Sequence, residues 1–335
     1  MRNSDSNRWK RDTALCFIIL ILMFLFVGLV FGLIIDWVFD TGPGFTMECI
    51  GFMFLVSLIA LVTCYASVEK TPDKIKGWIE LSRSDNESLF ACVDAMCDNL
   101  DIPTPRIYIT QDRFPNAFAV GRSPDNAHIC MTRGLIETVN GEELAAVLGH
   151  ELSHIAHRDT LVKGIARNCT SALTSSSMLI GLISLMFLGS FDSKGNRSGS
   201  SAGPFVLILM IIAVVMALFA LVMVVTIPGA CVITKGVVSR NREFLADEGS
   251  ARITGNPLAL ASALRKMEDV CVNGTAHIKA VDAMKWTVDP NCAKGRGIMD
   301  RITSTHPSTE ERIRRLEILA KELREEEVPL MIERR

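Results

Sequence analysis

Two histidines four residues apart, His150 and His154, flank Glu151 in the run HELSH. On a helix, positions i and i+4 lie on one face about 6 Å apart along the axis, so both imidazoles can reach one metal ion. Glu151 lies about 100° around the helix from His150, where its carboxylate can act on a water molecule at that ion. The spacing predicts a zinc-dependent hydrolase, and a helical histidine pair that is merely packed or solvated is the alternative.

The surrounding sequence favours a metal site on an amphipathic helix. Three of the six histidines in the chain fall between positions 150 and 157. Asn140 can cap the helix, with Glu143 reaching back from three positions later, and acidic residues suit the positive end of the helix dipole. Apolar residues form a stripe that leaves the histidines on a separate face: Leu144, Leu148, Leu152 and Ile155.

Two histidines leave a zinc ion in need of a third protein ligand. His157 is too far, because it lies about 10 Å along the axis from His150. It also occupies the glycine position of the extended motif in which a later histidine is the third ligand, so that class is excluded. A glutamate on a separate helix remains. Glu243 and Asp247 share a face at i, i+4, so Glu243 would bind zinc and Asp247 would accept the N–H of a ligating histidine, unless the pair is an ordinary charged helix face.

The chain also predicts a membrane protein. A mean hydropathy of +0.30 coexists with 21% charged residues, so polarity is segregated along the sequence. Residues 14–39, 45–66 and 205–227 are each long and apolar enough to cross a bilayer, and 171–188 forms a weaker fourth span. The first segment is too long for a signal-peptide core and lacks a following small-residue cleavage site, so we expect it to be retained.

Basic residues set the expected orientation. Arg2, Arg8, Lys10 and Arg11 precede the first span, whereas residues 40–44 carry no lysine or arginine. The positive-inside rule then places both termini and residues 68–168 in the cytoplasm. A second hairpin between the histidine pair and Glu243 would return the chain to the same side. The charges flanking the histidine helix are costly in hydrocarbon, which places the site outside the bilayer core.

The predicted organisation follows from these spans. It comprises a cytoplasmic N-terminus (1–12), a transmembrane hairpin (13–67), a cytoplasmic protease region with the zinc helix (68–170), a second transmembrane hairpin (171–230) and a cytoplasmic region with the third ligand and C-terminal helices (231–335). The fold class is mainly α: four transmembrane helices with a cytoplasmic α+β, zincin-like (gluzincin) protease domain that contains a small β-sheet.

Within the first protease region, residues 70–100 are expected to be helical, with a core stripe made of Leu89, Cys92, Val93, Met96 and Cys97. Short strands are expected at 106–109, 117–120 and 127–131. An edge strand there could pair with an extended peptide, which makes Asn116, Ala117 and Phe118 candidates for substrate binding, although an ordinary packed strand fits equally well.

A C-terminal helix should begin at Ser308, with Glu311 completing a capping box. His306 at its entry could be structural, or it could donate to a developing oxyanion together with Arg312.

Composition bounds the remaining possibilities. Ten cysteines without a C-x-x-C pair suggest reduced thiols and not a disulfide framework. A net charge of −2 gives no indication of nucleic-acid binding. The predicted partners are protein or peptide substrates and the lipid bilayer. The sequence does not set the oligomeric state.

With these motifs in order, the chain resembles the HtpX-type membrane metalloproteases, relatives of the CAAX prenyl endopeptidases. The resemblance rests on residues 116–119, 150–159 and 239–247, and on Thr305-His306-Pro307 with Arg312. It implies one Zn²⁺ per subunit, Glu243 as third ligand, Asp247 as the partner of a ligand, and His306 and Arg312 near the substrate.

The resemblance also implies a function. We expect a zinc endopeptidase of the bacterial or archaeal cell (inner) membrane that faces the cytoplasm and degrades damaged or misfolded membrane proteins, often under stress. A specific processing endopeptidase of the CAAX or another type, and a non-catalytic scaffold with structural zinc, are the alternatives.

Overall fold

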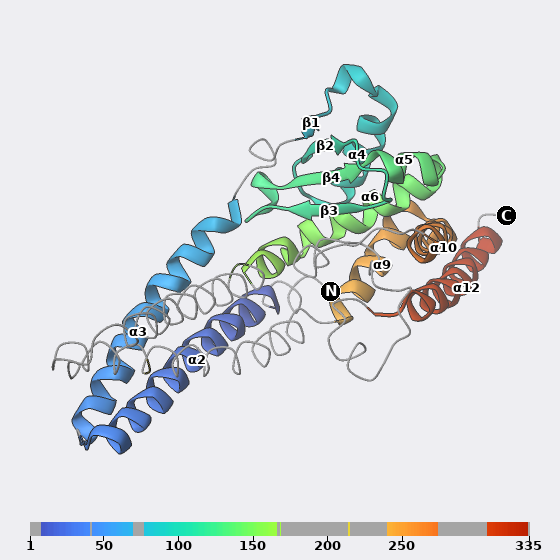
Figure 1. The fold of residues 1–335 in the computed structure, drawn as a ribbon. Coiled ribbons are helices and arrows are strands. Elements are labelled where there is room, and N and C mark those ends of the chain that lie inside the picture. Colours follow the sequence, from blue (N-terminus) through green and yellow to red (C-terminus); the bar gives the residue numbers. More distant parts are fainter. Residues whose placement is uncertain are drawn as a thin grey trace. The chain divides into compact units, whose positions relative to one another are not determined.

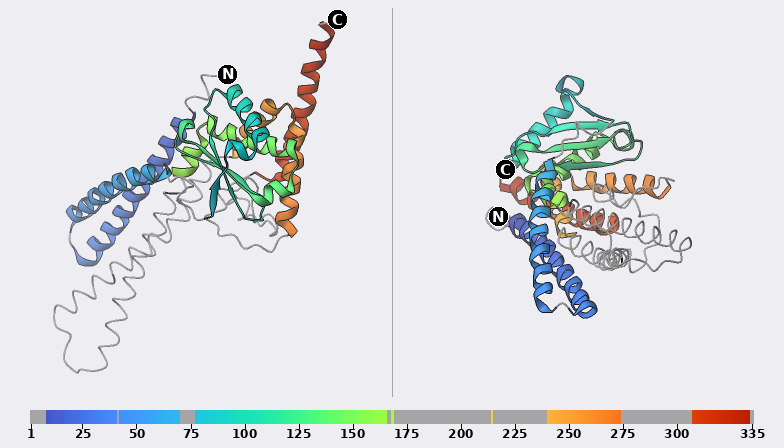
Figure 2. Two further views of the ribbon diagram at one scale, coloured as in Figure 1. Left: turned by 90° about the horizontal axis from the view of Figure 1, so that it is seen from above. Right: turned by 60° about the vertical axis from the view of Figure 1, so that its left-hand side comes forward.

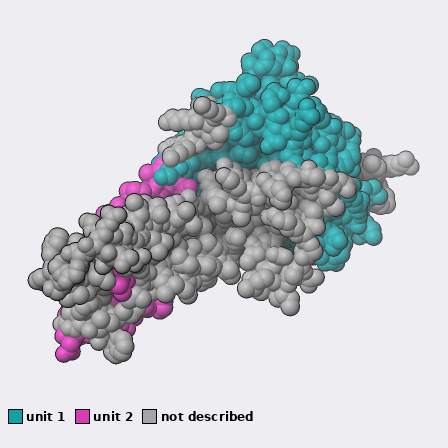
Figure 3. All heavy atoms as spheres, in the orientation of Figure 1, with its two compact units in different colours: residues 1–13, 67–165, 235–335 teal, residues 14–66, 166–234 magenta. Residues whose placement is uncertain are grey.

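The histidine helix lies in one of two compact units of the chain. The structure, a computed structural model, describes residues 8–40, 42–69, 77–165, 168, 214, 240–273 and 307–333. One unit comprises Met1–Thr13, Ser67–Ile165 and Lys235–Arg335, and the other comprises Ala14–Ala66 and Ala166–Thr234 (Figure 3). Each is described separately below.

The second unit contains α3 (Pro43–Ala66) and, from Ala14 onward, α2 (Arg8–Phe39), which are two long apolar helices. Both are long and apolar enough to cross a membrane, over Thr13–Leu33 and Pro43–Ala66. They pack closely where α2 carries Gly32, since a Cβ there would lie 2.7 Å from the Cα of Thr46 on α3. The other two predicted spans, 171–188 and 205–227, lie outside the described residues.

In the first unit, four strands form a small mixed sheet in the order β1-β2-β4-β3 (Figure 1). The strands are β1 (Trp78–Glu80), β2 (Arg106–Thr110), β3 (Ala117–Val120) and β4 (His128–Thr132). β2 and β4 run parallel, whereas β1 and β3 run antiparallel to their neighbours. The three predicted strands are confirmed to within one residue, and β3 lies at the edge of this sheet.

The prediction of one helix over residues 70–100 was wrong between residues 77 and 86, and residues 70–76 lie outside the described residues. Trp78–Glu80 pairs with β2 as β1, followed by the short 3₁₀ turn η3 (Arg83–Asp85). Helix α4 (Glu87–Leu100) begins only after Asn86, whose side chain accepts a hydrogen bond from the Leu89 N–H. A three-residue strand depends on its partner strand, so local periodicity does not reveal it. Within α4 the expected stripe holds, with Val93, Met96 and Cys97 buried in the core and Leu89 and Cys92 packed against it.

Helix α6 (Gly141–Ala156) lies between the sheet and the C-terminal helices (Figures 1 and 2). It contacts β3, α4, α9 (Arg240–Thr254) and α10 (Pro257–Asn273). Its predicted capping box is confirmed: Asn140 Oδ1 accepts from the Glu143 N–H at 2.9 Å, and Glu143 Oε2 accepts from the Asn140 N–H at 2.8 Å. The other named elements are η1 (Ser67–Glu69), η4 (Pro124–Asn126), α5 (Arg133–Thr138) and α12 (Thr309–Glu333).

The N-terminus of α12 matches the prediction in part. The helix starts one residue after Ser308, whose Oγ accepts a hydrogen bond from the Glu311 N–H at 3.3 Å. The Glu311 carboxylate binds Arg314 and Arg315, within the same helix. Glu311 therefore contributes to the first turn through its backbone N–H and these ion pairs.

Candidate metal centre

Small residues allow α6 and α9 to approach closely. A Cβ at Gly249 on α9 would lie 3.0 Å from the Cβ of Ser153 on α6, and nearer still to its Oγ. One turn earlier on α6, Gly149 faces Ser250, whose Oγ donates a hydrogen bond to the Ala146 carbonyl at 2.6 Å. Larger side chains would separate the two helices, so this contact fixes the spacing between the residues they present to each other.

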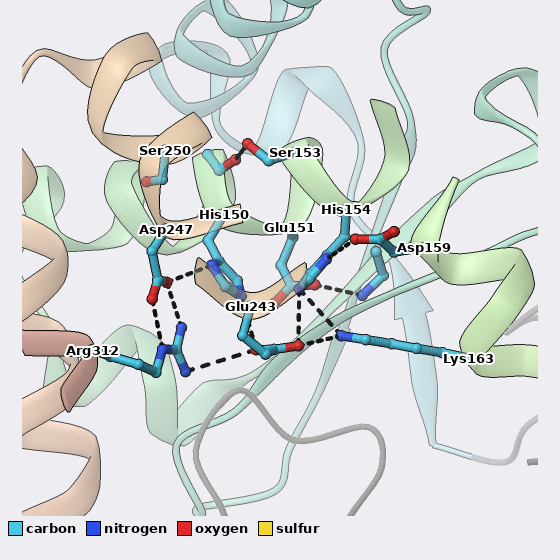
Figure 4. Close-up of polar contacts among 12 residues, drawn as sticks. His150, Glu151, Ser153, His154, Asp159, Lys163, Glu243, Asp247, Ser250 and Arg312 are labelled. Atoms are coloured by element: carbon cyan, nitrogen blue, oxygen red, sulfur yellow. Dashed lines mark hydrogen bonds and ion pairs between the residues drawn. The ribbon is translucent and has the colours of Figure 1, made fainter. Parts of the chain in front are cut away.

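That spacing brings His150 and His154 of α6 opposite Glu243 of α9 (Figure 4). The Nε2 of His154 lies 3.4 Å from Glu243 Oε1, and the Nε2 of His150 lies 3.7 Å from Oε2. One ligand atom from each residue can be chosen so that all lie within 4.8 Å of one another. Ligands bonded to zinc at about 2.0–2.1 Å in tetrahedral geometry lie roughly 3.4 Å apart. The donor atoms therefore fit such an ion with only small adjustments.

A carboxylate holds the Nδ1 atom of each histidine. Asp247, one turn beyond Glu243 on α9, lies 2.9 Å from Nδ1 of His150. Asp159 lies 2.8 Å from Nδ1 of His154. The hydrogen bond at Nδ1 of His154 orients that ring and leaves its Nε2 directed toward the ligand cluster. At His150 the Asp247 carboxylate lies within ion-pair distance of Nδ1, on the side of the ring away from Nε2.

An arginine in turn binds each carboxylate. Arg312 donates to Asp247 through Nε at 2.9 Å and Nη2 at 2.6 Å, and Arg242 forms an ion pair with Asp159. All four side chains are buried. Each histidine thus lies next to a buried carboxylate that is itself paired with a buried arginine. The arginine beside His150 comes from α12, and the arginine beside His154 comes from α9.

Acidic groups dominate the field at the centre. Burial raises the pKa of Asp247, but the Arg312 guanidinium and His150 outweigh it and lower that pKa to about 2. Burial and the Lys163 ammonium lower the pKa of His154, but the carboxylates of Glu243 and Asp159 outweigh them and raise it to about 9. The raised pKa of His154 indicates a negative potential at that ring, which favours a cation there. The lowered pKa of Asp247 keeps its carboxylate ionised beside Arg312.

Glu151 is buried beside these ligands, with 4% of its surface exposed. Its Oε2 accepts a hydrogen bond at 2.8 Å from the backbone N–H of Ala119, in the edge strand β3. The sheet therefore orients the carboxylate that the sequence assigns to water activation.

The residues predicted to bind substrate lie in or next to the edge strand β3. Asn116 and Ala117 are buried at the start of β3, where Asn116 exchanges hydrogen bonds with Thr132. Phe118 packs edge-on against Trp78 with ring centroids 5.5 Å apart. His306 lies outside the described residues.

Asp159, Arg242 and Lys163 also lie at this centre, and none of them was predicted from the sequence. A signal existed for Asp159, because a carboxylate soon after the second histidine can fold back on it. The chain reverses direction at Arg158, a non-glycine residue with φ of 57° that ends the turn after α6, and Asp159 thereby reaches His154. Arg242 adjoins Glu243, but its direction depends on how α9 packs.

Comparison with known proteins decides the family. The profile described as Peptidase family M48 matches residues 83–320. The chain belongs to peptidase family M48. A protein named Protease HtpX homolog from Sulfurihydrogenibium sp. (strain YO3AOP1) is 33% identical over 284 residues, which cover 81% of this chain and 86% of that protein.

The chain is similar to two further proteins. A second Protease HtpX homolog, from Thermococcus kodakarensis, is 33% identical over 306 residues, covering 90% of this chain and 95% of that protein. A solved structure, the crystal structure of S. mikatae Ste24p, aligns with a TM-score of 0.43 at 16% identity. The alignment covers 86% of this chain and 61% of that one. The expected relationship to HtpX-type proteases is confirmed, and this M48 chain is a metalloprotease.

Proposed function

We propose that the chain is a membrane-bound zinc endopeptidase that hydrolyses peptide bonds of damaged or misfolded membrane proteins at the cytoplasmic face. The observation that carries this proposal is the ligand cluster of His150, His154 and Glu243, with the Glu151 carboxylate buried beside it. Two imidazoles and one carboxylate suit zinc, and three protein ligands are typical of a catalytic site.

When bound, zinc would supply Lewis acidity toward water and toward the scissile carbonyl oxygen. Glu151 acts as the general base and then the general acid: it takes a proton from the attacking water and delivers it to the leaving amine. The Ala119 N–H holds one oxygen of this carboxylate in place at 2.8 Å. Asp247 and Asp159 keep the imidazoles oriented throughout.

In this mechanism Arg312 holds Asp247 and lies close to Glu243. Its Nε and Nη2 hold Asp247, and its Nη1 lies 3.9 Å from Glu243 Oε2. Arg312 thereby balances the buried negative charge around the ligands. A role of Arg312 in stabilising the oxyanion, together with His306, remains a prediction.

The edge strand offers a mode of substrate binding. β3 pairs with β4 on one side, and its backbone reaches Glu151 on the other. An extended peptide added along residues 116–118 would lie beside the catalytic glutamate and would be recognised mainly through its backbone. Such recognition suits a protease that cleaves many unfolded sequences.

The membrane assignment is supported by the two long apolar helices and by the basic residues before the first of them. The positive-inside rule favours a cytoplasmic N-terminus. Labelling of single cysteines placed at positions 42 and 84, in a variant without native cysteines, would test the orientation. We expect position 84 to react only after the cell membrane is opened.

A cleavage assay tests the enzymatic proposal. The full-length protein in detergent should contain one zinc ion per chain and should cleave an unfolded protein such as casein. Glu151→Gln should retain zinc and lose cleavage, because only the proton acceptor is removed. Cleavage retained in Glu151→Gln would exclude the proposed base. Bound zinc with no cleavage by the wild type would indicate a structural metal site instead.

A further inference from the structure

A lysine with no role in the proposed mechanism lies at the ligand cluster. The Nζ of Lys163 lies 2.7 Å from Glu243 Oε1 and 3.2 Å from Nε2 of His154 (Figure 4). Lys163 follows Asp159 by four residues in the helical segment 159–165, so both side chains lie on the same face, toward His154. An ammonium group therefore lies next to two of the three ligand atoms.

This position conflicts with a bound metal. A metal ion bonded to Glu243 Oε1 and His154 Nε2 at about 2.0–2.1 Å would lie within about 3.6 Å of Nζ, whatever the arrangement of the four atoms. A divalent cation and an ammonium group repel each other strongly at such a distance in a buried site. The Lys163 side chain must therefore withdraw when the metal binds.

The side chain is able to do so. It is 23% exposed, whereas that of Glu243 is 3% exposed. The flexible four-carbon stem of a lysine can carry the ammonium toward water without moving the backbone. Glu243, in contrast, stays in the interior, where its charge benefits from a nearby cation whenever no metal is present.

We propose that Lys163 is an internal competitor of the metal. Its ammonium pairs with Glu243 and stabilises the ligand set when the metal is removed, and the metal must displace it to bind. The inference rests on the metal site of the proposed function. It predicts two opposite effects of removing the charge: tighter metal binding and a less stable metal-free protein.

The test compares Lys163→Met with the wild type as full-length proteins in detergent. The metal is removed with a chelator, and zinc is then titrated in competition with a fluorescent chelator. We expect the Kd of Lys163→Met for zinc to fall by about 10-fold, which corresponds to one charge-assisted hydrogen bond. We also expect the Tm of the metal-free variant to be lower than that of the metal-free wild type.

Two further variants separate this role from a general effect of charge. Lys163→Arg keeps the charge and should bind zinc no more tightly than the wild type. Lys266→Met removes another lysine ion pair, in which Nζ lies 2.7 Å from Glu143 Oε2. It should leave the Kd unchanged and lower the Tm equally with and without zinc.

The outcomes distinguish the two proposals. If Lys163→Met binds zinc no more tightly than the wild type, or if its metal-free Tm does not fall, Lys163 is not a competitor, while zinc binding and cleavage by the wild type would still support the protease. If the wild type does not bind zinc, the metal site itself is refuted.

Discussion

Nδ1 of His154 lies 2.8 Å from Oδ2 of Asp159, five residues further along the chain. The left-handed turn at Arg158 brings the carboxylate back to the imidazole, and Arg242 holds it from α9. This contact orients one ligand from within its own segment, whereas Asp247 orients the other from a distant helix. The site therefore depends on one local and one long-range support.

Asp159→Asn should weaken zinc binding by about 10- to 100-fold, because an amide orients the imidazole less well and leaves Arg242 without its carboxylate. Chelator competition with the full-length protein measures this change. Asp94→Asn is the matched control, because Asp94 pairs with Arg83 at the surface. Equal zinc affinities for Asp159→Asn and the control would show that Asp159 does not support the metal site.

Gly249→Ala should lower the free energy of unfolding by about 1–3 kcal/mol and weaken zinc binding, because the added methyl group meets Ser153 and pushes α9 away from α6. Thermal unfolding and zinc titration report the two effects. Gly141→Ala adds the same methyl group at the start of α6, where nothing lies within 4 Å of it, and should cause neither. A stable Gly249→Ala variant with normal zinc affinity would contradict the argument that this contact sets the ligand spacing.

Ala119→Pro should reduce kcat by about 10- to 100-fold with zinc content unchanged, since it removes the N–H that binds Glu151 Oε2. Steady-state kinetics and metal analysis of the same sample test this. Proline is tolerated best at sheet edges, so β3 should survive the change, and an unaltered Tm verifies that. Unchanged kcat would mean that Glu151 needs no support from the strand.

Glu143→Gln should destabilise the protein at neutral pH by about 1–2 kcal/mol, because the Lys266 ammonium and Ser262 hydroxyl bind this buried carboxylate. Burial raises the pKa of Glu143, but these hydrogen bonds and that from the Asn140 N–H outweigh it and hold the pKa below 4.5.

The sign of the pH effect follows from that direction. A folded-state pKa below the unfolded value means that the stabilisation is fully present above about pH 4.5 and is lost as pH falls through the folded pKa. The difference in Tm between wild type and Glu143→Gln should therefore be largest near pH 7 and shrink in acid. A difference independent of pH would exclude the charge of Glu143 as its source.

The parts of the fold set by local sequence were predictable. The cap at Asn140 and the spacing of His150 and His154 depend on residues within a few positions of each other, and the three strands follow from short alternating runs. Glu243 was reached by excluding His157 and by the shared face with Asp247. Glu243 can meet the two histidines only if the chain returns to the same side of the membrane between them.

What sequence reasoning missed depends on packing between distant segments. β1 exists because Trp78–Glu80 pairs with β2, and its three residues carry no pattern of their own. The directions of Arg242 and Lys163 are set by how α9 and the segment 159–165 meet α6. A charged residue in sequence does not reveal which of several buried partners it will have.

The tight contact between Ser153 and Gly249 has a consequence for how such chains can vary. Because α6 and α9 bind each other directly, their registration does not depend on the length of chain that joins them. Insertions or deletions between positions 168 and 235 should thus leave the two halves of the metal cluster aligned, provided that both helices still start on the same side of the bilayer.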